Sequence, residues 1–180
     1  MRRPYQIFMP LLSLFLTRVD LTDLYPLFMR VEILKVYDGD TVLIRKGSFQ
    51  QKVRLSRIDA PEKNQPYLNG QKGAGPLAMN CLERLLANKG MLKIEGHDIY
   101  QRILGDVDEV SLKLVKEGCV ALYPYARFES VAEKYLYLKS YFKARQLRKG
   151  LWAFGGVMQP KAWRKKNKFR KRNADRRLRR

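Results

Sequence analysis

Three short β-type runs follow one another between residues 31 and 55, and they constrain the fold more than any other feature. The first leads into a Tyr-Asp-Gly-Asp turn at residues 37–40, and the second covers residues 41–44. In the third, Val53 and Leu55 alternate with polar residues, which is typical of a half-buried strand. Consecutive strands with tight turns indicate an antiparallel meander, because a parallel βαβ unit needs a long crossover.

Beyond this meander the pattern predicts two more strands and three helices. The strands are expected at residues 91–94 and 103–107. The helices are expected from Pro76 to residues 88–90, over residues 110–117, and from a capping box at residues 130–133 to Gly150. Together these elements predict an α+β, mainly β fold, a five-stranded OB-fold barrel with about three helices packed outside it.

The chain carries far more positive than negative charge, which favours a polyanionic partner. It has 37 Lys and Arg residues against 17 Asp and Glu, a formal net charge of +20. A protein that neutralises phosphates gains affinity by releasing their counterions. Anionic membrane surfaces would attract the same charge, so charge alone does not distinguish nucleic acid from lipid.

The charge and the patterning divide the chain into three parts. An N-terminal extension covers residues 1–29, and the barrel domain covers residues 30–154. Residues 155–180 hold more than half of the net charge and little apolar surface, so we predict a disordered basic tail. The tail is expected to raise affinity for nucleic acid, and the alternative is a solvated tail that only aids solubility.

The N-terminal residues resemble an export signal, since Arg2 and Arg3 precede an apolar run over residues 7–16. The run is too short to span a bilayer, and no small-residue cleavage site follows it. The sequence favours a periplasmic, secreted or membrane-anchored protein with weak membrane association through this segment. The alternatives are a packed extension and a cytoplasmic protein. Cys81 and Cys119 allow either one disulfide or two free thiols.

Carboxylates gather at turns and strand ends in two short segments, at Asp38, Asp40, Asp59 and Glu62. A meander can bring the turn at Asp40 beside the end of the third strand. Hard oxygen ligands without His or Cys nearby suit Ca²⁺ or Mg²⁺ and not zinc. Taken alone, the Asp-Gly-Asp sequence is also ordinary turn chemistry.

Three motifs in a fixed order are similar to those of the staphylococcal nuclease (thermonuclease) family. They are Val-Tyr-Asp-Gly-Asp-Thr-Val at residues 36–42, Val-Arg-Leu-Ser-Arg-Ile-Asp-Ala-Pro-Glu at residues 53–62, and Asp-x-Tyr-x-Arg at residues 98–102. The resemblance covers about residues 31–152. It implies a calcium-dependent endonuclease that hydrolyses the P–O5′ bonds of DNA and RNA without sequence preference and leaves 3′-phosphates. No feature indicates a protein partner, and a monomer is expected.

The resemblance also assigns the metal and the catalytic water. Asp40 and Asp59 match the calcium carboxylates, and the backbone carbonyl of Ala60 matches a third ligand. Glu62 matches the residue that orients or deprotonates the attacking water. The family often has Thr where Ala60 stands, a change that should matter little because the ligand is a backbone atom.

Arginines and tyrosines complete the set implied by the resemblance. Arg54 and Arg102 match the pair that clamps the scissile phosphate, a role that suits the forked guanidinium. Tyr100, Tyr123 and Tyr125 match residues that line the nucleotide pocket. Where the family usually has Gly before the second arginine, this chain has Gln101. If that residue adopts positive φ, Gln would strain the turn and shift Arg102.

Two other functions fit part of the sequence. A non-catalytic nucleic-acid-binding barrel would reuse the same fold, but a retired site is expected to lose some of its catalytic residues, and every one is present. A membrane-surface protein would explain both basic ends and would leave the three central motifs unexplained.

Overall fold

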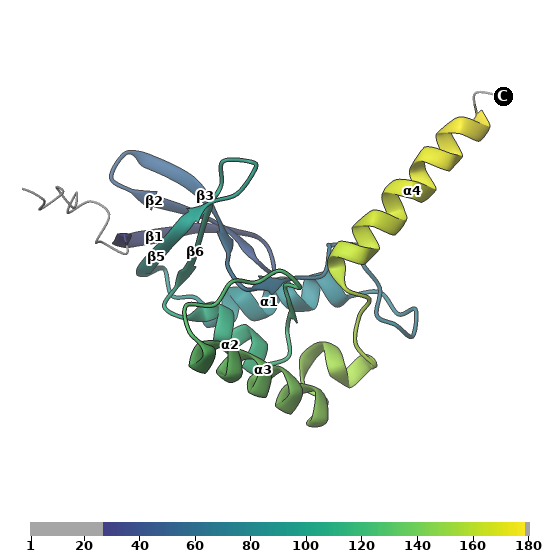
Figure 1. Ribbon diagram of the computed structural model, residues 1–180. Coiled ribbons are helices and arrows are strands. Elements are labelled where there is room, and N and C mark those ends of the chain that lie inside the picture. The colour runs from purple at the N-terminus through teal and green to yellow at the C-terminus, as the bar shows by residue number, and fades with distance from the viewer. Residues whose placement is uncertain (1–26, 179–180) are drawn as a thin grey trace, which may run out of the picture.

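The computed structural model describes residues 27–178 of the chain, and Figure 1 shows a barrel flanked by helices, with one long helix projecting from it. The strands are β1 (Leu27–Asp38), β2 (Thr41–Lys46), β3 (Phe49–Leu55), β4 (Ile58–Asp59), β5 (Lys89–His97), β6 (Ile103–Val107) and β7 (Ala121–Leu122). The helices are α1 (Ala74–Leu85), α2 (Val110–Lys116), α3 (Val131–Gln146), the 3-10 helix η1 (Gly150–Phe154) and α4 (Pro160–Leu178).

Five strands close into a barrel in the order β1-β2-β3-β6-β5. The first three form the predicted antiparallel meander, β3 pairs with β6 in parallel, and β5 pairs with both β6 and β1. Strands β4 and β7 make a separate two-stranded sheet. The prediction of a five-stranded barrel with helices outside it is therefore confirmed.

The alternation seen in the sequence separates the core from the surface. Val42, Ile44, Val53 and Leu55 are buried in the barrel, and α1 adds Leu82 to the same core. Each fully buried aliphatic side chain contributes about 1.5–3 kcal/mol by leaving water. This packing holds the ends of β2 and β3 in fixed positions, and the site residues lie at those ends.

Several element boundaries differ from the predictions, among them the following three. Strand β1 begins at Leu27, which pairs with Ile94, so the barrel starts inside the expected N-terminal extension. Helix α1 begins at Ala74 and not at Pro76, because a proline anywhere in the first turn lacks only an N–H that has no helical partner. Helix α3 ends at Gln146, before the expected Gly150, because Arg148 turns to a φ of +50°.

The basic tail differs most from its prediction, because residues 160–178 form helix α4 instead of a disordered segment. Lys, Arg, Ala and Leu are good helix formers, and Pro160 stands at the first helical position, where its fixed φ is favourable. The carbonyl of Gln159 accepts from the Trp163 N–H at 2.9 Å to start the helix. The prediction considered only apolar burial and omitted the polar contacts that anchor the first turn.

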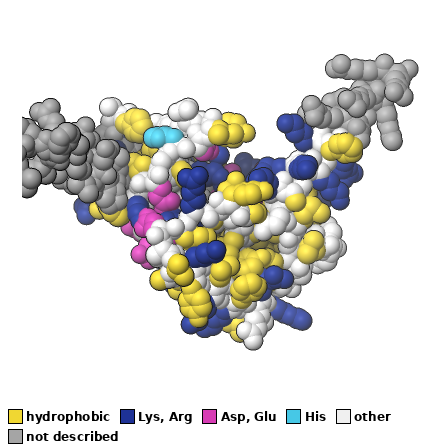
Figure 2. All heavy atoms as spheres, in the orientation of Figure 1, with side chains coloured by type: hydrophobic (Ala, Val, Ile, Leu, Met, Phe, Trp, Pro, Cys, Tyr) yellow, Lys and Arg dark blue, Asp and Glu magenta, His cyan; other side chains and the backbone are white. Residues whose placement is uncertain are grey.

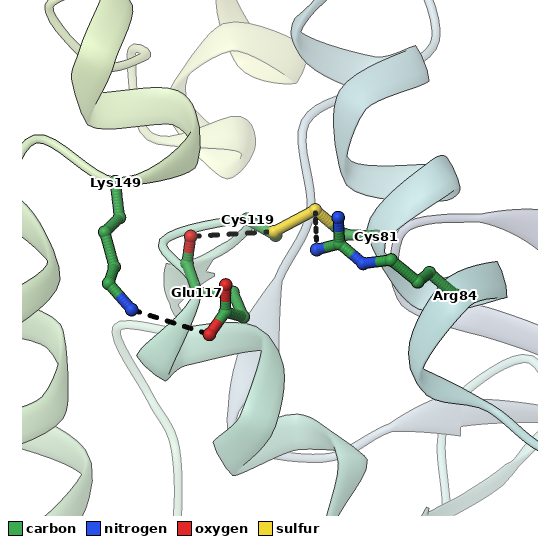
Figure 3. The surroundings of a disulfide bond; sticks show 5 residues. All are labelled: Cys81, Arg84, Glu117, Cys119 and Lys149. Atoms are coloured by element: carbon green, nitrogen blue, oxygen red, sulfur yellow. Dashed lines mark hydrogen bonds and ion pairs between the residues drawn. A yellow bond between two sulfur atoms is a disulfide. The ribbon is translucent and has the colours of Figure 1, made fainter.

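Cys81 of α1 and Cys119, which follows α2, form a disulfide, and Figure 3 shows it beside Arg84, Glu117 and Lys149. The bond ties α1 to the segment that leads into β7. Within residues 27–178 no helix has the length and apolar character needed to cross a membrane. The apolar run at residues 7–16, on which the export interpretation rests, lies outside the described residues.

Candidate active site

The turn between β1 and β2 places Asp40 against the loop that follows β4. A Cβ on Gly39 would lie 2.6 Å from the Cβ of Ala78 and 2.8 Å from that of Ala60, so only glycine allows this close approach. The carboxylate of Asp40 then accepts from the Ala60 N–H at 2.7 Å. The turn residues and the end of the third strand thus meet, as the meander implied.

Arg54 of β3 joins the two candidate metal carboxylates. Its guanidinium forms an ion pair with Asp40, and its Nη2 lies 3.1 Å from Oδ1 of Asp59. The side chain of Asp59 is fully buried and that of Asp40 is 7% exposed, while Arg54 remains 16% exposed. The structure therefore brings Asp40, Arg54, Asp59 and Ala60 together in one buried cluster.

Glu62 lies at the edge of this cluster on a firmly held backbone. Its N–H donates to Oε1 of Gln65 at 3.3 Å, and the buried Gln65 side chain donates to the carbonyl of Met158 at 2.6 Å. A Cβ on Gly75 would lie 2.3 Å from the Glu62 carbonyl oxygen, so the start of α1 packs directly on this loop. Gln65 is a positioning residue that the sequence reasoning missed, because a lone Gln in a polar loop carries no distinguishing signal.

Helix α4 contributes two further groups that the sequence reasoning missed. Arg164 donates to Oε1 of Glu62 at 2.7 Å and to both carboxylate oxygens of Asp59 at 3.0 and 3.3 Å. The backbone N–H of Lys161 donates to Oδ2 of Asp59 at 3.1 Å. The partners in these contacts lie more than a hundred residues apart in the sequence. The basic run around Arg164 does not indicate which of its side chains would make them.

Burial and charge act in opposite directions on the carboxylates. Burial alone would raise the pKa of Asp40, but the charge and hydrogen bonds of Arg54 outweigh it and lower that pKa. The pKa of Asp59 is raised by burial, with Asp40 adding to the effect and Arg164 and Arg54 opposing it. Burial and the charge of Asp40 raise the pKa of Asp38 to about 6. An added cation would therefore stabilise the ionised cluster.

The loop before β6 holds Arg102 by a local network. The carboxylate of Asp98 accepts from the Arg102 Nε at 2.8 Å and from the backbone N–H groups of Tyr100 and Arg102. Burial opposes the charge of Asp98, but the bonds from Arg102 outweigh it and lower the Asp98 pKa. Gln101 has a φ of +60°, the left-handed conformation that glycine adopts without strain.

Arg102 is separate from the carboxylate cluster in its contacts. Among the described residues, its ion pair is with Asp98, and its guanidinium lies 5.6 Å from the ring centroid of Tyr100. The parallel pairing of Arg54 with Leu104 nevertheless places the start of β6 beside β3. Arg54 and Arg102 thus come from neighbouring chain segments without a shared partner.

The three candidate nucleotide-binding tyrosines fall into two places. The rings of Tyr123 and Tyr125 lie 5.8 Å apart, edge to face, with Nζ of Lys161 3.8 Å from the Tyr125 centroid. Tyr100 is largely exposed on the loop that holds Arg102. The structure therefore groups Tyr123 and Tyr125 with the first turn of α4 and leaves Tyr100 with the other arginine.

The donors at the cluster suit a hard divalent cation. Asp40 and Asp59 supply carboxylate oxygens, which calcium prefers, and the Ala60 backbone is held beside them by its N–H. Across residues 27–178 there is no group of three or more His, Cys, Asp or Glu side chains that could hold a metal ion. A cation held here would need two carboxylates, a backbone carbonyl and water, a combination that calcium accepts.

A family model described as staphylococcal nuclease homologue matches residues 52–154. A Haemophilus influenzae protein named as an uncharacterized endonuclease is 34% identical over 143 residues, which cover 76% of this chain and 74% of that protein. The micrococcal nuclease of Shigella flexneri is 29% identical over 77% of this chain and 82% of its own. The thermonuclease of Staphylococcus intermedius is 34% identical over 57% of this chain and 62% of its own.

Proposed function

Because this chain belongs to the staphylococcal nuclease homologue family, we propose that it is a calcium-dependent endonuclease that hydrolyses the phosphodiester bonds of DNA and RNA and leaves 3′-phosphates. Relatives named endonuclease, micrococcal nuclease and thermonuclease support the nuclease activity. The observation that carries the proposal is the position of Arg54, whose guanidinium contacts both Asp40 and Asp59. A phosphate-binding group and two metal-binding groups are thereby held at one place.

Asp40, Asp59 and the backbone carbonyl of Ala60 are the proposed calcium ligands. When bound, calcium would offset the negative charge of the phosphate oxygens as a Lewis acid. Burial raises the pKa of Asp59, so a bound cation would favour the ionised form of this carboxyl group. The bond from the Ala60 N–H to Asp40 fixes the two segments relative to each other before any ligand binds.

Glu62 is proposed to orient or deprotonate the attacking water. Its side chain is 39% exposed, whereas that of Asp59 is fully buried, so water reaches Glu62. Its backbone is fixed by Gln65 and by the close packing of Gly75. A general base must be accessible to the water and held in position, and Glu62 meets both conditions.

Arg54 and Arg102 are proposed to donate to the scissile phosphate from two sides. Each presents several N–H groups in a fixed fork, which matches phosphate oxygens and stabilises the extra charge of the transition state. The ion pairs with Asp40 and Asp59 pre-orient Arg54, and Asp98 pre-orients Arg102. The exposed rings of Tyr100 and Tyr125 are available to stack on bases without sequence preference.

We also propose that the protein is exported from the cytoplasm, and the disulfide supports this. Disulfides persist in oxidising compartments and are rare in the cytosol. The bond between Cys81 and Cys119 therefore supports a periplasmic or extracellular location. We propose that the protein acts there as a monomer on nucleic acid.

The proposal is tested by digesting single-stranded DNA with Ca²⁺ or with excess chelator, comparing wild type with Glu62→Gln. We expect cutting only with Ca²⁺ and a rate about 10²–10⁴-fold lower for Glu62→Gln, the usual contribution of a general base. Glu83→Gln, at an exposed position on α1, removes the same charge elsewhere and should cut like wild type. Wild type that binds DNA and never cuts it would instead support the non-catalytic binding barrel.

A further inference from the structure

We propose that the first turn of α4 is a built-in competitor that occupies the candidate site until calcium and nucleic acid displace it; this inference rests on the proposed nuclease function. The helix leaves the body of the molecule at this turn and projects outward beyond it (Figure 1). Its beginning contacts the site through Lys161 and Arg164.

The carboxylate of Asp59 is saturated by the docked helix. Its Oδ1 accepts from Arg54 at 3.1 Å and from Arg164 at 3.0 Å. Its Oδ2 accepts from the Lys161 N–H at 3.1 Å and from Arg164 at 3.3 Å. With the side chain fully buried and both oxygens engaged by two donors, a metal ion can bind Asp59 only after Arg164 and Lys161 leave.

Electrostatic repulsion also opposes metal binding at Asp59, in addition to the occupation of both its carboxylate oxygens. The N-terminus of a helix carries about half a positive charge, and α4 points this end at Asp59 through the Lys161 N–H. The guanidinium of Arg164 adds a full positive charge at the same carboxylate. A divalent cation placed there would be repelled by both, so the docked helix and the bound metal oppose each other.

The same turn covers the other proposed functional groups. Arg164 holds the carboxylate of Glu62 at 2.7 Å, which occupies an oxygen that the attacking water would use. The Lys161 ammonium lies 3.8 Å from the Tyr125 ring centroid and 5.9 Å from that of Tyr123, over the rings proposed to stack on bases. One docked turn therefore contacts a proposed metal ligand, the proposed general base and the rings of Tyr123 and Tyr125.

The outer part of the contact, between Arg164 and Glu62, is weak. The side chains of Arg164 and Glu62 are 42% and 39% exposed, and water screens ion pairs of this exposure. Beyond this turn, Lys165, Lys166 and Lys168 are exposed to solvent, and Figure 2 shows blue Lys and Arg side chains on the part of α4 nearest the body of the molecule. A polyanion that binds Lys165, Lys166 and Lys168 would draw α4 away from Asp59, which couples release of the site to arrival of substrate.

The test is calorimetric titration of Ca²⁺ into the full-length protein without nucleic acid, comparing wild type with Arg164→Gln. Removing the competing guanidinium should tighten calcium binding about 5-fold or more, since the apparent affinity equals the intrinsic affinity multiplied by the fraction of molecules in the open state. Arg170→Gln removes the same charge from an exposed position six residues farther along α4. This control should bind calcium within about 2-fold of wild type, because charges well separated in water are screened.

A second readout follows the helix itself. In wild type, saturating Ca²⁺ should accelerate hydrogen exchange of the Lys161 amide, measured by NMR, because its acceptor Asp59 becomes a metal ligand. Equal calcium affinity in wild type and Arg164→Gln, with the Lys161 amide still protected, would refute the competition and leave the nuclease proposal intact. If neither protein binds calcium, the calcium site of the proposed function fails, and the competition fails with it.

Discussion

Breaking the bond between Cys81 and Cys119 should destabilise the protein by about 4 kcal/mol. The bond closes a loop with a sequence separation of 38. Loop-closure entropy for a loop of this size is about 13 cal/mol/K, which gives about 4 kcal/mol at room temperature. The loop contains β5, β6 and α2, so its extra freedom in the unfolded chain involves a large part of the domain.

The assay is urea unfolding of wild type and of the Cys81→Ala/Cys119→Ala double variant. With a slope near 2 kcal/mol/M, the midpoint should fall by about 2 M. Wild type measured in a thiol reductant should move toward the double variant, and the reductant should leave the double variant unchanged. A midpoint shift below about 0.5 M would refute the reasoning, because it would mean that the bond does not constrain the unfolded chain.

Two further perturbations follow from the structure. Burial raises the pKa of Asp106 to about 7, above its unfolded value, so Asp106 favours the folded state at low pH and this contribution is lost as the pH rises from about 4 through 7. Asp106→Asn keeps the acceptor for the Ser111 N–H. This variant should be more stable than wild type at pH 8, by a few kcal/mol, with little difference at pH 4. Equal urea midpoints at pH 8 would contradict a raised pKa for Asp106. Deleting residues 161–180 should weaken binding to single-stranded DNA and flatten its salt dependence, since each lost phosphate contact lowers the slope by about 0.7. An unchanged salt slope in titrations from low to high salt would show that α4 does not contact the nucleic acid.

The barrel could be predicted because its determinants are local. The alternation around Val53 and Leu55 and the Asp-Gly turn before Thr41 each fit in a few residues. Sequential strands in a meander become neighbours in space, so the meeting of Asp40 with the end of β3 follows from the order of the strands. The need for glycine at position 39 is not local in the same sense, because it depends on the approach of Ala60 and Ala78.

The parts that could not be predicted depend on contacts between distant polar residues. Arg164 is one of many basic residues in its segment, and nothing periodic marks it as the partner of Asp59 and Glu62. Gln65 is similar, since the hydrogen bond that holds its side chain goes to the distant carbonyl of Met158. The sequence predicts strain at Gln101 if this residue has a positive φ. The structure shows a positive φ there. Helix α4 was missed because disorder was judged from apolar content alone, whereas charged contacts anchor its first turn.

The central claim is that the cluster of Asp40, Arg54, Asp59 and Glu62 cuts phosphodiester bonds with calcium. The most direct measurement is the chemistry of the ends produced when purified protein digests a 5′-labelled single-stranded DNA with Ca²⁺. We expect internal cuts that leave 3′-phosphates, all abolished by excess chelator. Cutting that persists in chelator, or products that carry 3′-hydroxyls, would contradict it.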